Sequence, residues 1–215
     1  ALTPPRPNPT PTRRRASRSA GPLVAPAALT VAGAVIEGGP SDWSALRLER
    51  LGAGPGTAAL GFAAFAAGML AGRLTGDHLT DRHGGVAVLR GGMALVAAGL
   101  LAGALVDHPV AFAAGLVVAG VGAAGLFPLA FSAAATTPGV APGAGAATVS
   151  LAARLGFMAE PVLMGTLAEL VGLRWAFAAV AGVAAAVAVA ARRLLGPRVR
   201  LVAGDEGTIA DLRTG

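Results

Sequence analysis

The chain has 215 residues, of which 54% are hydrophobic and only 13% are charged. An average soluble domain carries about 25% charged residues, so this composition has too little charge to cover a soluble globule and too much apolar content for disorder. The absence of cysteine from the sequence excludes disulfides, thiolate catalysis and cysteine-ligated metal sites.

The net charge of +6 rests on arginine, because the 17 basic residues include no lysine. A basic chain is a candidate nucleic-acid binder, but these arginines stand in separate clusters between apolar runs rather than on one docking face. Attraction to anionic lipid headgroups accounts for the clusters better. The sequence therefore predicts a lipid bilayer, and no nucleic acid, as a partner.

In chain order, residues 1–20 contain five prolines and five arginines, which is typical of a flexible polar linker. Six apolar runs of the length that a bilayer-spanning helix needs then follow. We expect the spans at about 22–48, 56–75, 86–106, 110–134, 144–169 and 174–194. Buried helices of a soluble protein are the alternative for the shorter runs, but six in succession with hardly any polar face argue against it. Residues 21–195 are thus predicted to form an all-α polytopic membrane domain, with a polar cytoplasmic tail at 196–215.

An even number of spans places both termini on the same side of the membrane. That side carries 13 arginines: five in residues 1–20, five near the C-terminus, and Arg73, Arg82 and Arg90 around the second loop. The other side carries three. The excess of arginine predicts that both termini lie in the cytoplasm of a bacterial cell, with the spans in its plasma (inner) membrane.

Three glycines of the second span, Gly68, Gly72 and Gly76, stand four residues apart and share one helix face. Small residues at this spacing let another helix approach closely, so this face is predicted to pack against a neighbour. A polar turn from Leu79 to Gly84 is expected to follow at once on the cytoplasmic side.

This combination resembles the signature loop that joins the second and third helices of each six-helix half in the major facilitator superfamily. The pattern is matched at four positions, which are Leu79, Asp81, Arg82 and Gly84. Three positions depart from it. Asp77 stands where the first glycine is usual, with Gly76 one residue early, and Gly85 and Val86 replace a basic pair.

The resemblance implies that the loop is a cytoplasmic gate. In the family its aspartate, here Asp81, accepts hydrogen bonds near a helix N-terminus of the opposite half, where the helix dipole favours an anion. Arg82 would pair with acidic groups or backbone carbonyls across the same interface, and these contacts would break and form again as the halves rock. The alternative is a solvated turn that only fixes topology.

The segment from Glu37 to Trp43, taken with Arg73 and Asp77, resembles a bacterial subgroup of that superfamily whose substrates are poorly assigned. In such proteins this segment ends the seventh helix, so the chain resembles the C-terminal half, helices seven to twelve, a 3+3 inverted repeat. The resemblance implies a secondary active transporter that moves a small solute by alternating access, without a cofactor. Its partner would be an N-terminal six-helix half or a second copy, and a proton is a candidate coupling ion.

A non-transporting accessory or sensor protein of the membrane, or a degenerate half-transporter, is the alternative function, because six helices supply only one wall of a pathway. Enzyme chemistry is not predicted. The run from Gly120 to Gly125 fits a nucleotide-binding pattern but follows no strand, so helix packing explains it better. Two aspartates and two histidines at 77–83 are read as a solvated loop, and no metal is predicted.

Four ionisable residues inside the predicted spans need a reason, since a charge near the bilayer centre costs about 2.5–3.5 kcal/mol on insertion scales. Arg154 and Glu160 in the fifth span replace Tyr and Gly of the pattern G-Y-x-G-F-x-x-G-P in the resembled subgroup. They form either a polar site in a central cavity or a packing feature. Glu37 and Asp42 lie near the outer end of the first span. Glu37 is a candidate for binding a proton or a cation, with a position in water as the alternative.

Overall fold

The structure, a computed structural model, describes residues 21–141 and 143–195. The predicted linker at 1–20 and tail at 196–215 lie outside the described residues. The described part contains helices and short connections, and no strand. In chain order the elements are η1 (Gly21–Leu23), α1 (Val24–Arg50), α2 (Pro55–Ala58), α3 (Leu60–His83), α4 (Gly85–Leu105), α5 (Pro109–Ala123), α6 (Leu126–Ala135), α7 (Ala144–Val171) and α8 (Leu173–Leu195).

Six stretches of the described chain are long and apolar enough to cross a membrane as helices. They are Gly21–Arg50, Pro55–His83, Gly85–Leu105, Pro109–Ala135, Ala144–Val171 and Leu173–Leu195. Each overlaps one predicted span, and most ends differ by only one or two residues. The prediction of an all-α polytopic membrane protein is confirmed.

The second span continues well beyond its predicted end. The turn expected from Leu79 to Gly84 is wrong, because α3 stays helical as far as His83 and Gly84 alone, with a φ of +82°, connects it to α4. No proline interrupts α3, and the Thr80 hydroxyl donates to the Gly76 carbonyl one turn earlier. The correction also moves Arg73 from the edge of a loop to the helix interior, about 15 Å from the end of α3 at 1.5 Å per residue.

One interruption within a span lies next to a proline. The fourth span divides at residues 124–125 into α5 and α6, and Pro128 lies in the first turn of α6. Because proline has no N–H, the carbonyl one turn before it loses its helical partner, which explains the break. In contrast, α7 contains Pro161 and still continues as one helix.

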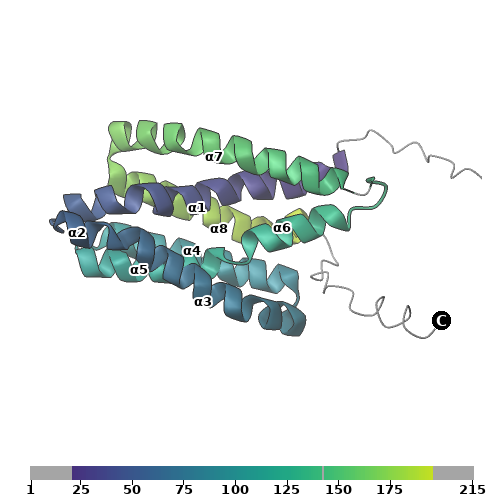
Figure 1. Cartoon of the computed structure of the whole chain (residues 1–215), viewed down its shortest axis with the longest axis horizontal. Helices are drawn as coiled ribbons and strands as arrows, with labels where there is room; N and C mark the ends of the chain where they lie inside the picture. The colour runs from purple at the N-terminus through teal and green to yellow at the C-terminus, as the bar shows by residue number, and fades with distance from the viewer. Residues whose placement is uncertain (1–20, 142, 196–215) are drawn as a thin grey trace, which may run out of the picture.

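The spans pack as two sets of three, with α3, α4 and α5 in one set and α1, α7 and α8 in the other (Figure 1). The same pattern of contacts occurs in both sets. α3 packs on α5 as α7 packs on α1, α4 packs on α5 as α8 packs on α1, and α4 packs on α8. Successive spans alternate in direction, so the second set is inverted relative to the first. This is the arrangement of a 3+3 inverted repeat.

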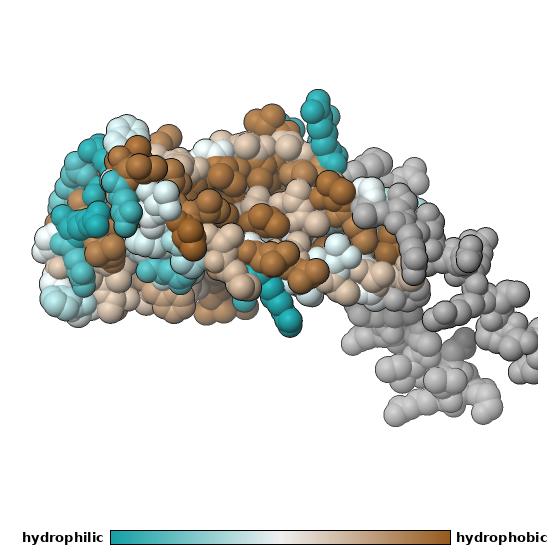
Figure 2. All heavy atoms as spheres, turned by 90° about the horizontal axis from the view of Figure 1, so that it is seen from above, coloured by the Kyte–Doolittle hydropathy of each residue, from teal (hydrophilic) through white to brown (hydrophobic). Residues whose placement is uncertain are grey.

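The connections define two ends of the bundle. At one end, which we call the Gly84 end, α1 is preceded by η1, α3 meets α4, and α6 connects to α7. At the other, the Asp107 end, lie the connections α1–α2, α4–α5 and α7–α8. Figure 2 shows hydrophobic residues over the middle of one face and hydrophilic residues gathered at the Asp107 end. This face thus has the largely apolar middle that a surface within a bilayer requires.

Candidate functional site

The signature residues lie in the last turns of α3, at the Gly84 end. Asp77, Asp81 and Arg82 are exposed, and Leu79 is 41% exposed. Among residues 21–141 and 143–195, neither aspartate nor Arg82 forms an ion pair or a side-chain hydrogen bond, and the acidic and histidine residues form no group that can hold a metal. These charged groups therefore project from the bundle and are free to meet another surface.

The glycine face of α3 divides into a packed part and an open part. A Cβ at Gly68 would collide with the backbone carbonyl of Val117 in α5, and one at Gly72 would lie 2.5 Å from the Val121 carbonyl oxygen. At Gly76 a Cβ would meet nothing within 4 Å. Gly68 and Gly72 thus hold α3 against α5, whereas Gly76 borders open space.

Glu160 is buried between α7 and α1, with 1% of its surface exposed. A Cβ at Gly38 would lie 2.9 Å from the Glu160 Cδ, and the Oε1 is 3.8 Å from the corresponding point at Gly39. Neither carboxyl oxygen has a hydrogen-bond partner among the described residues. The carboxyl group therefore fills a space that two adjacent glycines leave open.

Arg154 lies one and a half turns before Glu160 on α7 but is exposed, on a face with Leu151, Met158 and Val162. The structure does not bring the two charges together, and no ion pair joins them. Arg154 stands near the middle of an apolar span, where a charge that faces lipid is costly.

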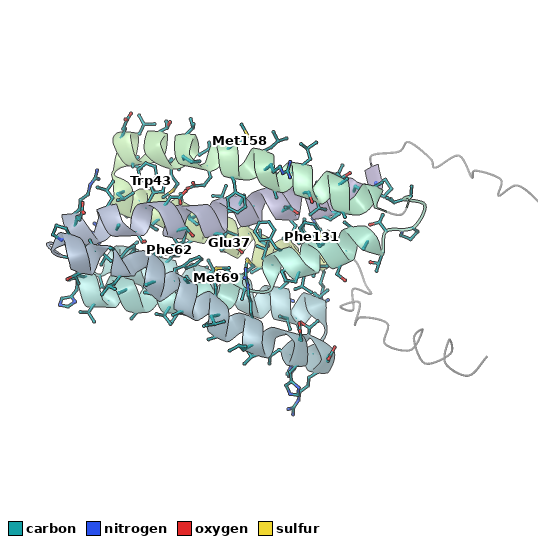
Figure 3. The ribbon with its side chains drawn as sticks, viewed as in Figure 1. Glu37, Trp43, Phe62, Met69, Phe131 and Met158 are labelled. Atoms are coloured by element: carbon teal, nitrogen blue, oxygen red, sulfur yellow. The ribbon has the colours of Figure 1, made fainter. Side chains whose placement is uncertain are left out.

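Glu37 and Arg73 border one groove of about 330 Å³ between α1 and α3. The groove is also lined by Ser41, Phe62, Phe65, Ala66, Met69 and Leu70. Figure 3 shows Glu37 on α1 in the same part of the bundle as Phe62 and Met69 of α3. Asp42, the remaining acidic candidate on α1, is exposed and does not line this groove.

Arg73 is the residue of this site that sequence reasoning missed. The sequence places it at the predicted end of the second span, next to a cytoplasmic loop, because a polar run follows it. The same groove is lined by Phe62, Phe65 and Met69, which precede Arg73 at helical spacing on the same side of α3. That spacing, continued to Arg73, is the signal in the sequence.

Two further cavities border α3. The larger, of about 500 Å³, lies among α3, α4 and α5 and is lined almost entirely by glycine and apolar residues, with Thr75 and His83 as its polar members. A smaller one of about 200 Å³ lies on the α6 side and includes Arg73 and Asp77. Arg73 therefore stands between two cavities, each with one acidic residue at its wall.

At the opposite end of the bundle, Asp107 joins two arginines from distant parts of the chain. Its Oδ1 accepts from the Arg47 Nη2 at 2.8 Å, and its Oδ2 accepts from the Arg174 Nη1 at 3.0 Å. Arg174 also donates to the Leu105 carbonyl at 2.9 Å. The end of α1, the α4–α5 connection and the start of α8 are thus tied together.

Known proteins resemble the chain over most of its length. The family model of the Major Facilitator Superfamily matches residues 18–212. An uncharacterised MFS-type transporter of Yersinia pestis is 34% identical over 157 residues, which cover 73% of this chain and 41% of that protein. The membrane protein MosC of Rhizobium meliloti is 33% identical, with 73% of this chain and 39% of MosC covered. The uncharacterised transporter y4wD of Sinorhizobium fredii is 37% identical, with coverage of 76% and 44%. The chain spans about two fifths of the length of these relatives.

Proposed function

The chain belongs to the major facilitator superfamily, and from this premise we propose that it forms one six-helix wall of a secondary active transporter. The transporter moves a small solute across the membrane by alternating access. The observation that carries this proposal is the groove between α1 and α3, where Glu37 and Arg73 place opposite charges inside membrane-spanning helices. Charged groups at that depth are costly, so they mark a substrate or ion pathway.

The second wall is an N-terminal six-helix half or a second copy of this chain. The relatives are more than twice as long as the part that this chain matches, which favours a half on the same polypeptide. The exposed Arg154 supports the same arrangement, because it stands on an apolar face of α7 near mid-span. A second wall would cover that face and give the guanidinium a partner.

The Gly84 end is the cytoplasmic end, with both termini in the cytoplasm of a bacterial cell and the helices in its inner membrane. The clusters of arginine at this end support the orientation. The end of α3, with Gly76, Asp77, Leu79, Asp81, Arg82 and Gly84, acts as the gate. Asp81 and Arg82 are exposed there, so a facing helix of the second wall supplies their partners and closes the pathway on this side.

Glu160 is the candidate site for a coupling proton. Its two carboxyl oxygens are buried without a hydrogen-bond partner among the described residues, an arrangement that is costly for an ion. A proton that enters or leaves this group would change the contact between α7 and α1 directly. Asp42 is exposed on the same helix as Gly38 and provides a polar step toward the Asp107 end.

The test is transport by the full-length protein in proteoliposomes, measured as counterflow with a broad panel of small solutes and as movement of protons. We expect accumulation of at least one solute that depends on an imposed gradient. Folded protein that moves no solute and no proton across the whole panel would contradict the proposal and favour a non-transporting accessory or sensor role.

A further inference from the structure

The groove between α1 and α3 holds its two charges near the middle of the membrane. The expected position of Glu37 near the outer end of the first span is wrong, because Glu37 lies near the middle of Gly21–Arg50. Arg73 lies not far past the middle of Pro55–His83. No ion pair joins the side chains of Glu37 and Arg73 in the part of the chain that the structure describes. The two opposite charges therefore face one space without neutralising each other by contact.

We propose that this groove binds a zwitterionic solute, with one ammonium group, one carboxylate group and an apolar body. Glu37 receives the ammonium group and Arg73 the carboxylate, for which the planar guanidinium fork is well suited. The inference rests on the proposed transport function and names the substrate class for the same pathway.

The apolar lining of the groove defines the body of the solute. Phe62, Phe65 and Met69 present aromatic and thioether surface, and Leu70 adds an aliphatic side. Ser41, one helical turn from Glu37, adds a hydroxyl near the acidic end. The volume of about 330 Å³ is at the low end of small-molecule sites, which matches a solute the size of an aromatic or branched-chain amino acid.

Other classes of solute fit this lining less well. An anion would lie against Glu37 and a cation against Arg73, so each would meet a like charge within the same groove. A sugar would leave both charges without an ionic partner away from water and would meet mostly apolar walls. A net-neutral solute that carries one ammonium and one carboxylate group gives both residues an ionic partner at once.

The experiment compares three matched ligands on the full-length protein in detergent and in proteoliposomes. The ligands are L-phenylalanine, phenethylamine and 3-phenylpropionate, which share the aromatic body and differ in their charged groups; L-leucine is a second zwitterion. We expect the zwitterions to raise the melting temperature and to exchange across proteoliposomes, and the two singly charged analogues to bind at least tenfold more weakly.

Glu37→Gln and Arg73→Gln are each expected to weaken binding of the zwitterion by at least tenfold while the protein stays folded. The matched controls Glu49→Gln and Arg90→Gln change exposed charges of the same types outside the groove and leave the affinity unchanged. Transport of another solute with no response to zwitterions, or with normal rates in both groove variants, overturns this inference and leaves the transport function standing. Binding of the zwitterion without flux supports the groove assignment and contradicts transport instead.

Discussion

The carboxyl group of Glu160 occupies the place that a side chain at Gly38 would fill. A Cβ at Gly38 would lie 2.9 Å from the Cγ and Cδ of Glu160 and 3.0 Å from its Oε2. Gly38 and Glu160 come from α1 and α7 and are far apart in the sequence, so they meet only in the folded bundle. The buried carboxyl group of Glu160 and the missing side chain of Gly38 are two parts of one contact.

Gly38→Ala should therefore lower the stability of the folded protein, because the added methyl group pushes the Glu160 carboxyl out of its space. Overpacking of this kind costs about 1–3 kcal/mol. The double variant Gly38→Ala/Glu160→Gly should recover most of the loss, since the second change removes the colliding group. Size-exclusion chromatography after a heating series measures both. Gly182→Ala is the control, because a Cβ there meets nothing within 4 Å. If the double variant is no more stable than Gly38→Ala, the loss of stability does not come from a collision between the added methyl group and Glu160.

The glycine face of α3 predicts different results at neighbouring positions. Gly72→Leu should reduce the yield of folded protein, because its Cβ meets the Val121 carbonyl oxygen and the Ala124 Cβ at 2.5 and 2.7 Å. Gly76→Leu, one turn further along, should leave the fold intact, since no atom lies within 4 Å of the new Cβ. Monodispersity and melting temperature distinguish the two. Equal damage from both variants would mean that helix propensity rather than packing sets the role of these glycines.

Asp107 is expected to stabilise the Asp107 end mainly through Arg47. The side chain of Arg47 is 9% exposed and that of Arg174 is 35% exposed, so loss of the carboxylate leaves one cation buried and one partly exposed to water. Asp107→Ala should cost about 1–3 kcal/mol, as for an unpaired buried group, and Arg174→Ala less than about 1 kcal/mol. Thermal unfolding of both variants and of the exposed control Arg50→Ala gives the order of their losses in stability. A larger effect of Arg174→Ala would reverse the assignment.

The proposed gate predicts a variant that folds but does not transport. Asp81→Asn keeps the shape of the side chain and removes its charge, so it should reduce flux at least tenfold while insertion and melting temperature remain normal. Its exposed position without a partner among the described residues is the reason for expecting an unchanged bundle. Glu169→Gln changes an exposed carboxylate near the other end of the bundle and serves as the control. Normal flux in Asp81→Asn would remove the gate.

Orientation can be tested directly because the sequence contains no cysteine. Single cysteines are introduced at the exposed positions His83, at the Gly84 end, and Glu49, near the Asp107 end. In intact cells a membrane-impermeant maleimide should label Glu49→Cys and leave His83→Cys unlabelled until the membrane is opened. The reverse pattern would place the Gly84 end outside the cytoplasm and contradict the orientation taken from the arginines.

The spans were predictable because apolar runs of sufficient length leave a chain few alternatives in a bilayer. The end of α3 was not, since the polar residues from Asp77 onward resemble a loop although the helix continues past them to Gly84. A helix that leaves the apolar layer keeps its backbone hydrogen bonds and simply changes its side chains. Hydropathy marks the point where the helix leaves the apolar layer and not the point where the helix ends.

The candidate site was predictable only in part. Glu37 stands out as a carboxylate inside an apolar run, but its groove partner Arg73 falls at the predicted end of the second span, among the arginines around the next loop. Glu160 stood out too, while the glycines that receive it carry no signal of that role. Contacts between α1 and its neighbours depend on how the helices are rotated and crossed, which a single sequence does not state.

The inverted repeat gives the Glu160 contact a wider meaning. Gly68 and Gly72 of α3 meet the backbone of α5, and Gly156 and Glu160, at the same spacing on α7, meet Ala34 and Gly38 of α1. In the first interface glycines of α3 face the backbone of α5, whereas in the second the carboxyl group of Glu160 on α7 faces Gly38 of α1. Backbone against backbone cannot adjust, whereas a carboxyl group can rotate. The α3–α5 and α7–α1 interfaces therefore differ in stiffness. We expect motion during a transport cycle to concentrate at α7 while α3 and α5 move as one unit.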